Sequence, residues 1–461
     1  MSNTVERDRD QSPNGPKAGE PVAPVDTAGP PEQAHVNVED TDKAAQPSHD
    51  PGYLPPEFPN PRKTIVLVLI AAIGLYIVNM SLGTALSLHI AAIMPDRKDS
   101  VYSHITSVSS FLALFMMPLA GALSDRTISR FGRRRPWILG GLLFSIVCGA
   151  VVGLSSNVWV MGVFFILSAM GMQSAFNAYS VIAVEGLPDN RRGTVMGLMG
   201  LCGALAFSAG TYLTGALVGN GLLLMTVPVL LGLVTSLPLL LLYKDPAKTK
   251  SEVPPMNVKK FIGTFFVNPR KYPNFGWTWL SRFLVGLAMA AMQSYFIYYL
   301  ISGLHIPLNQ VGSKAGLLTL CSAPVSIIFF TGSGFLTDHL GRKKPFVILA
   351  SILMAAALCL GATSHNFTQF LIAWLLFAVG QAMYLTVDLA LCAAVLPNSE
   401  DTGKDMSVFG LAINLSSVVV LAAAPLIINT AGGHNYGLLW FIAAALSLCS
   451  VLAIPLIKGV K

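Results

Sequence analysis

The chain is poor in charged residues. Only 11% of its 461 residues are Asp, Glu, Lys or Arg, whereas a soluble domain has about 25%. This shortage argues against a soluble protein. The formal net charge of +7 does not predict a nucleic-acid-binding protein either, because the basic residues fall in short connections between apolar segments and do not share one folded face.

Several motifs of catalysis and metal binding are missing as well. The absence of a Gly-x-x-x-x-Gly-Lys-Ser/Thr phosphate loop argues against an ATP-driven pump, and the absence of His-Glu-x-x-His and Gly-x-Ser-x-Gly argues against a membrane enzyme. The 6 cysteines stand singly in apolar segments without Cys-x-x-Cys spacing, so neither disulfides nor a zinc site are predicted. We therefore expect no enzyme activity, no metal site and no cofactor.

What the chain has in abundance is long apolar segments, since 53% of its residues are hydrophobic. Stretches of about 20 residues that are apolar all round predict membrane-spanning helices, because lipid leaves the backbone no partner outside the segment. The predicted fold is an all-α integral membrane protein with 12 spans. Their limits are 64–92, 102–124, 137–155, 159–184, 193–218, 222–243, 276–303, 310–337, 345–363, 367–396, 405–430 and 436–457.

Two polar segments divide the chain. Residues 1–60 hold 11 prolines, an excess of acids and few bulky apolar residues, which predicts a disordered tail without a signal peptide. The tail is either a solvated leader or a partner-binding segment. Residues 244–275 form a polar linker between two six-helix bundles at 61–243 and 276–461.

The two bundles carry matching sequences. The stretch "GALSDR" from Gly121 matches "GFLTDH" from Gly334, and "GRR" from Gly132 matches "GRK" from Gly341. A second pair of loops, "VEGLPDNRRG" and "AVLPNSEDTG", repeats at nearly the same offset. Two matches at one offset indicate two parallel repeats of six spans, as in transporters with a binding site near the bilayer midplane.

The repeated Gly-x-Leu-x-Asp-Arg…Gly-Arg-Arg loop resembles the signature loop of the major facilitator superfamily, and the resemblance covers residues 62–461. The longer stretch "SDRTISRFGRRRPWIL" more narrowly resembles the sucrose–proton symporters and related glycoside transporters. This resemblance implies the major facilitator fold and transport by alternating access. It also implies a cytoplasmic gate at these loops, formed by Asp125, Arg126, Arg133 and Arg134, with Asp338, Arg342 and Lys343 in the second repeat. The alternative is that these charges only set the orientation of the chain.

Two opposite charges lie within predicted spans at similar depth, Arg282 in the segment 276–303 and Asp388 in the segment 367–396. Either charge alone in a low-dielectric region would be costly, so we expect them to pair. An acid within a span is a functional hypothesis by default, and we interpret the pair as a proton-coupling device. A purely structural ion pair is the alternative.

In the resembling fold the segments 64–92, 159–184, 276–303 and 367–396 line a central cavity, which implies that the ion pair faces the transport path. Neutral polar residues on these segments predict a binding site for a small, hydroxyl-rich solute. The candidates are Asn79, Gln173, Asn177, Gln293, Gln381 and Tyr384. Each amide could instead join neighbouring helices. Tyr295, Tyr298 and Tyr299 lie near one end of their segment, where we expect them in an aromatic belt at the membrane interface.

These observations, with the resemblance, predict a secondary transporter that moves a small polar organic solute, first of all a sugar or glycoside, by proton-coupled alternating access. The expected partners are the small-molecule substrate, protons and the lipid bilayer, with no nucleic acid, and we expect a monomer. One alternative is a proton-driven exporter of an amphipathic compound, whose pocket the methionines and aromatics of "AMAAMQSYFIYY" could line. Another is a membrane receptor or scaffold that does not transport.

The basic residues also predict the orientation. On one side of the spans, the connections and the two ends of the segment 62–461 together hold 22 Lys and Arg. The connections on the other side hold little beyond Arg97 and Lys98. Because basic connections stay in the cytoplasm, we expect both termini inside the cell, in a plasma-membrane protein.

In a cysteine-free background, a cysteine at Ser251 should resist an impermeant thiol reagent added to intact cells, and one at Asn435 should react. The reverse labelling would overturn the orientation.

Overall fold

The computed structural model describes residues 61–129, 131–185, 189–243, 272–395, 402–430 and 434–457. The predicted tail at 1–60 lies outside this range, and so does nearly all of the predicted linker at 244–275. The limits proposed for the tail, the linker and the two bundles therefore stay predictions.

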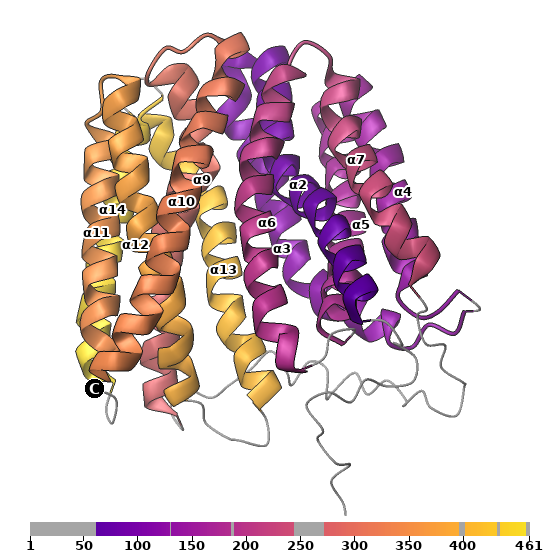
Figure 1. Cartoon of the computed structure of the whole chain (residues 1–461). Helices are drawn as coiled ribbons and strands as arrows, with labels where there is room; N and C mark the ends of the chain where they lie inside the picture. The colour runs from indigo at the N-terminus through magenta and orange to yellow at the C-terminus, as the bar shows by residue number, and fades with distance from the viewer. Residues whose placement is uncertain are drawn as a thin grey trace, which may run out of the picture. The chain divides into compact units, whose positions relative to one another are not determined.

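The described residues form long helices and no strands (Figure 1). The α-helices are α2 (Pro61–Ile93), α3 (Lys98–Ser124), α4 (Arg135–Leu154), α5 (Val158–Glu185), α6 (Asp189–Ala216), α7 (Gly221–Leu242), α9 (Pro273–Ser302), α10 (Leu308–Leu340), α11 (Lys344–Ala362), α12 (Phe367–Ala394), α13 (Thr402–Ile428) and α14 (Tyr436–Ala453). Short 3-10 helices, η1 (Pro95–Arg97) and η4 (Ile454–Leu456), adjoin α3 and α14.

Among the described residues, 11 helices are long and apolar enough to cross a bilayer, and a bent pair of segments makes up to 12. The bent pair lies in α3, whose two parts meet at Pro118 at an angle of 41°. Proline causes such bends because it lacks the N–H that would close a helical hydrogen bond. The predicted all-α membrane fold is confirmed.

Polar residues fix several helix starts. The side chains of Asn220, Asn366 and Asn435 accept hydrogen bonds from backbone N–H groups three residues on, at the first turns of α7, α12 and α14. These asparagines satisfy donors that a helix start leaves free. They therefore limit where each apolar segment can begin.

The helices pack in two sets. In the first set α2 packs against α6 and α7, α4 against α5 and α7, and α3 against α5. In the second set α9 packs against α13 and α14, α11 against α12 and α14, and α10 against α12. The two sets meet mainly where α6 packs against α10 and α3 against α13. A cavity between the sets therefore has walls from both repeats.

The two ends of the helices carry different residues. One end holds η1, and we call it the η1 end; the other holds the loop from Asp125 to Arg135, and we call it the arginine end. The first described residue and the last, at the start of α2 and just past η4, both lie at the arginine end (Figure 1).

Small residues allow close helix contacts. A Cβ atom added to Gly153 on α4 would lie 2.3 Å from the backbone oxygen of Gly221 on α7, and one added to Gly215 on α6 would lie 2.1 Å from the Cα atom of Gly312 on α10. Backbones cannot come this close when side chains intervene. In lipid the hydrophobic effect does not bring helices together, so close packing of this kind stabilises their association instead.

These contacts predict a matched pair of variants on one helix. Gly153→Ala should lower the free energy of unfolding by about 1–3 kcal/mol, because the added methyl group overpacks a backbone contact. Gly140→Ala, also on α4 but with nothing within 4 Å of its added Cβ, should leave stability unchanged or raise it by up to about 1 kcal/mol through helix propensity. Thermal unfolding of the purified proteins compares the two. Equal effects would contradict the packing of α4 against α7.

Candidate functional site

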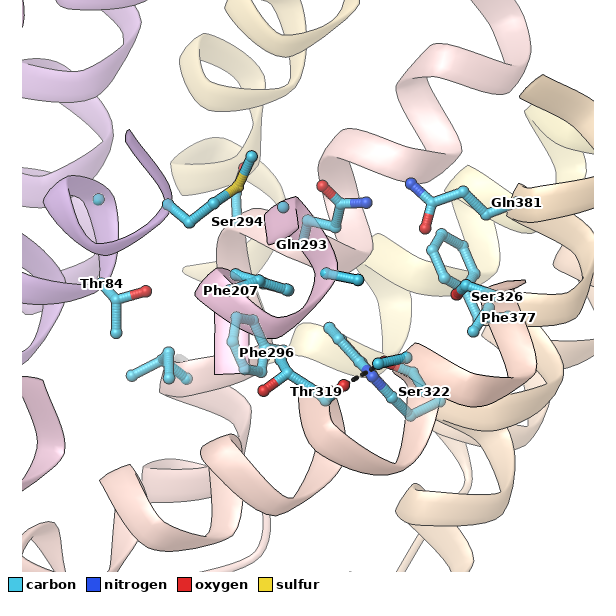
Figure 2. Close-up of a pocket in the computed structure, with 18 of the residues that line it drawn as sticks. Thr84, Phe207, Gln293, Ser294, Phe296, Thr319, Ser322, Ser326, Phe377 and Gln381 are labelled. Atoms are coloured by element: carbon cyan, nitrogen blue, oxygen red, sulfur yellow. Dashed lines mark hydrogen bonds between the residues drawn. The ribbon is translucent and has the colours of Figure 1, made fainter. Parts of the chain in front are cut away.

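A central cavity of about 430 Å³ lies between the two sets of helices. Its walls come from α2, α3, α6, α9, α10 and α12 (Figure 2). The lining residues are Asn79, Met80, Gly83, Thr84, Ser87, Tyr102, Gly203, Ala204, Phe207, Gln293, Ser294, Phe296, Ile297, Thr319, Ser322, Ala323, Ser326, Trp374, Phe377, Ala378 and Gln381. None of these lining residues is charged, so the cavity suits a neutral solute.

Amides and hydroxyls supply the polar part of the lining. Gln293 on α9 and Gln381 on α12 point their amides toward one another in Figure 2. Thr319, Ser322 and Ser326 are spaced by three and four residues, so they share one face of α10. Amides and hydroxyls both donate and accept hydrogen bonds, which matches a ligand that carries several hydroxyl groups.

Aromatic rings supply much of the apolar part. Phe207 comes from α6, Phe296 from α9, and Trp374 and Phe377 from α12. The rings of Phe296 and Trp374 lie 4.8 Å apart between centroids. Pockets of this kind, apolar with a few convergent polar groups, are typical of small-molecule sites.

The six predicted substrate residues divide between several places. Asn79, Gln293 and Gln381 line the central cavity. Gln173 lines a smaller neighbouring cavity that Asn79 also touches. Asn177 is buried, with its amide oxygen 3.6 Å from the position of a Cβ atom on Gly121. Tyr384 is fully buried and belongs to the surroundings of the ion pair described next.

Arg282 and Asp388 meet, as the sequence led us to expect. Arg282 Nη1 donates to Asp388 Oδ2, and the side chains are 12% and 1% exposed. The guanidinium also lies over the ring of Phe409 on α13, 4.1 Å from its centroid. The expectation that the pair faces the transport path is not met, because neither residue lines the central cavity. Asp388 lies seven residues beyond Gln381 on α12, or about 10 Å toward the arginine end at the rise of a helix.

Other polar groups surround this pair. The Tyr384 hydroxyl neighbours both Asp388 and Ser281 but reaches hydrogen-bond geometry with neither. Asp388 Oδ1, Arg282 Nε and Ser281 Oγ are likewise buried without a hydrogen-bond partner. Buried polar atoms of this kind need an explanation. A carboxylate oxygen with free acceptor capacity can take up a proton.

At the arginine end, the Asp125 side chain pairs with arginines of its own loop. Its Oδ1 lies 2.7 Å from Arg134 Nη2 and 3.7 Å from Arg133 Nη1. Arg134 is buried, whereas Asp125 is half exposed. Arg126 donates to the backbone oxygen of Ala122 at 2.8 Å, and Arg135 donates to that of Leu240. The aspartate thus pairs with arginines of the same repeat.

The second repeat differs at the equivalent loop. Arg342 is exposed and Lys343 is half-buried. Gly341 adopts a left-handed conformation with φ of 60° and ends α10, a common role of glycine. The side chain of Asp338 lies outside the described residues.

A cluster of contacts at the η1 end was not predicted from the sequence. Tyr436 on α14 donates to Asp99 on α3 at 2.6 Å, and His434 Nδ1 lies 3.3 Å from the same carboxylate. The hydroxyls of Ser103 and Tyr295 lie 2.5 Å apart and join α3 to α9. These contacts hold the two sets of helices together at this end.

The aromatic belt predicted for α9 is wrong. Tyr295, Tyr298 and Tyr299 are all buried, and the rings of Tyr295 and Tyr298 contact Tyr102 on α3 at centroid distances of 6.2 and 5.3 Å. Position near a helix end suggested the interface, but Tyr295 and Tyr298 face α3, and Tyr299 packs against rings of α12 and α14. The hydrogen bond between Tyr295 and Ser103 of α3 could not be seen in α9 alone.

The family follows from a match over most of the chain. The model of the Major Facilitator Superfamily matches residues 64–332 and 278–460. The chain belongs to the Major Facilitator Superfamily. It is a membrane transporter and not an enzyme.

Individual relatives of this superfamily member are distant. The human Proton-associated sugar transporter A is 47% identical over 57 residues, which are 12% of this chain and only 7% of that protein. The MFS transporter asaE of Aspergillus flavus is 25% identical over 373 residues, 77% of this chain and 76% of that one. The chain thus matches only a small part of the first relative and about three quarters of the second.

Solved transporters share the fold. The nucleoside transporter NupG superposes with a TM-score of 0.70 at 13% identity, covering 86% of this chain and 100% of that one. A D-xylose-proton symporter superposes with a TM-score of 0.65 at 16% identity, covering 87% and 98%. At these identities the likeness concerns the fold alone.

The buried ion pair predicts a stability pattern. Arg282→Ala leaves the Asp388 carboxylate buried and unpaired, which should cost about 3–5 kcal/mol. The double variant Arg282→Ala/Asp388→Asn should recover much of this loss because no lone charge remains. Membrane abundance and thermal unfolding measure both, with Arg342→Ala as the control at an exposed arginine. A double variant no more stable than Arg282→Ala would contradict the pairing.

Proposed function

We propose that this chain is a proton-coupled secondary transporter of a neutral, polyhydroxylated solute, most favourably a sugar or glycoside. The observation that carries the proposal is the uncharged central cavity, with Gln293 and Gln381 facing one another from α9 and α12. A charged substrate would need an opposite charge in so buried a site. A sugar can instead bond to the amides and hydroxyls, with its apolar faces against the aromatic rings.

Alternating access is the proposed mechanism, because the cavity lies between two sets of helices that can rock against one another. We assign the η1 end to the outside and the arginine end to the cytoplasm from the distribution of basic residues. Under that assignment, the bonds from Asp99 to Tyr436 and from Ser103 to Tyr295 close the outer side. They would have to break when the transporter opens outward.

The arginine-end loops are the proposed gate on the other side. Asp125 with Arg133 and Arg134, flanked by Arg126, would form the main gate, and Asp338, Arg342 and Lys343 the weaker one. The ion pair between Asp125 and Arg134 supports a loop that is held in a defined shape. Rearranging this loop would accompany the opening and closing of the cytoplasmic side.

Asp388 is the proposed proton carrier, and Arg282 holds it ionised once the proton has left. Support comes from the burial of the pair and from the free acceptor capacity of Asp388 Oδ1. Tyr384, beside the carboxylate, lies one helical turn from Gln381, so α12 links the ion pair to the cavity wall. Protonation would release Arg282 and change the packing of α12 against α9.

The names of two similar proteins support a sugar substrate. One relative is named a proton-associated sugar transporter and one structural neighbour a D-xylose-proton symporter, although the first match is short and the second shows only the fold. The amphipathic exporter has less support, because Met289 and Met292 of α9 are buried in helix packing and do not line the cavity.

A substrate screen tests the proposal. We expect a neutral sugar or glycoside to raise the melting temperature of the purified protein, because a ligand that binds only the folded state stabilises it. Gln381→Ala should weaken the affinity for that ligand about tenfold or more, since its hydrogen-bond partner on the ligand is left unpaired.

Gln310→Ala is the matched control, because Gln310 is exposed at the start of α10 and outside the cavity. It should leave affinity unchanged. Stabilisation by charged solutes alone, with no response to any neutral sugar or glycoside, would contradict the proposed substrate class.

A further inference from the structure

A second cavity of about 250 Å³ lies within the first set of helices, between α2, α3 and α5. It is lined by Asn79, Leu82, Gly83, Ser109, Ala113, Met116, Ala169, Met170, Met172 and Gln173. Asn79 and Gly83 line the central cavity as well. The two cavities therefore adjoin at this pair of residues, and we call the smaller one the side pocket.

The side pocket differs from the central cavity in chemistry. Met116, Met170 and Met172 supply three flexible thioethers, and Leu82 and two alanines add further apolar surface. Methionine adapts its shape to varied apolar ligands. Amides gather on the side toward α2 and α5, where Asn79 and Gln173 both contribute to the lining. The lining thus combines a few polar groups with a mainly apolar wall.

Gly83 keeps the junction open. A Cβ atom at this position would have only the Tyr102 hydroxyl within 4 Å, at 3.8 Å. The glycine is therefore not required by a close helix contact, unlike Gly153 on α4. A side chain here would project into the space that the two cavities share.

We propose that the side pocket is a second subsite, which takes an apolar aryl or short alkyl substituent of a glycoside whose sugar ring occupies the central cavity. This proposal rests on the proposed function. The pocket is large enough, since an apolar cavity of about 150 Å³ can hold benzene. The substrate class is then an amphipathic glycoside, with hydroxyls bound between the helix sets and the aglycone bound within the first set.

Burial of an aryl group away from water should strengthen binding markedly. We expect a 4-nitrophenyl glycoside to bind about 10 to 100 times more tightly than its parent sugar, as apolar burial of that size implies. The measurement uses the full chain, purified, with affinities from thermal shift over a panel of neutral monosaccharides and their 4-nitrophenyl glycosides.

Two variants fill the side pocket from two of its helices. Ala113→Leu on α3 and Ala169→Leu on α5 alter residues that line the side pocket and not the central cavity. Each should reduce the preference for the aryl glycoside at least about fivefold, with the affinity for the parent sugar within about twofold of the unaltered protein. Using both keeps the test valid if one variant fails to fold. Ala204→Leu, which fills the central cavity instead, should weaken sugar and glycoside alike.

The outcomes separate the two proposals. Equal affinity of the unaltered protein for sugar and aryl glycoside would overturn the subsite, and so would an undiminished preference in both filled variants. Binding of the sugar in those cases would leave the proposed function standing. Failure of every sugar and glycoside to bind would overturn the proposed function and the subsite together.

Discussion

The cost of placing charge in hydrocarbon governs this structure. A lone ionised side chain costs about 2.5 kcal/mol or more at the centre of a membrane-spanning helix. Each charged side chain there must therefore find a partner. Arg282 and Asp388 meet this demand by pairing across α9 and α12, two helices that also supply walls of the central cavity. Any event that changes the charge of Asp388 must therefore change how these helices hold one another.

The same constraint explains the rest of the polar architecture. The cavity uses amides, hydroxyls and aromatic rings, which can be left without a ligand at far lower cost than a charge. Clusters of charged residues lie instead at the helix ends. Asp125 and its arginine partners lie at one end, and Asp99 with His434 lies at the other. A neutral binding site between two charged ends is what a solute carrier needs if solvent is to reach the site from one end at a time.

Sequence reasoning succeeded where residue type and position along a helix carried the signal. Apolar segments predicted the helices, and the matched depths of Arg282 and Asp388 predicted their contact. The resemblance implied which helices line the cavity, and on them Asn79, Gln293 and Gln381 were chosen by type and spacing; all three line the cavity. The hydroxyls of Thr319, Ser322 and Ser326 were missed, although their spacing on one face of α10 could have revealed them.

Prediction from the sequence failed where a contact depends on how each helix is rotated about its axis relative to its neighbours. Tyr295 and Tyr298 looked like interface residues, yet α3 covers them. The hydrogen bond between Asp99 and Tyr436 joins residues 337 positions apart. No local sequence pattern predicts this contact. The side pocket likewise depends on three helices that come together around Gly83. The rotation of a helix about its axis is decided by its neighbours, so one segment does not contain it.

Asp388 is proposed to couple solute movement to protons, and the variant Asp388→Asn tests this coupling in proteoliposomes loaded with a sugar that binds the unaltered protein. The amide mimics the protonated acid. We expect the variant to exchange labelled sugar across the membrane but not to accumulate it when a proton gradient is imposed. Accumulation by Asp388→Asn at normal abundance would rule out proton coupling at this residue and leave the ion pair a structural one.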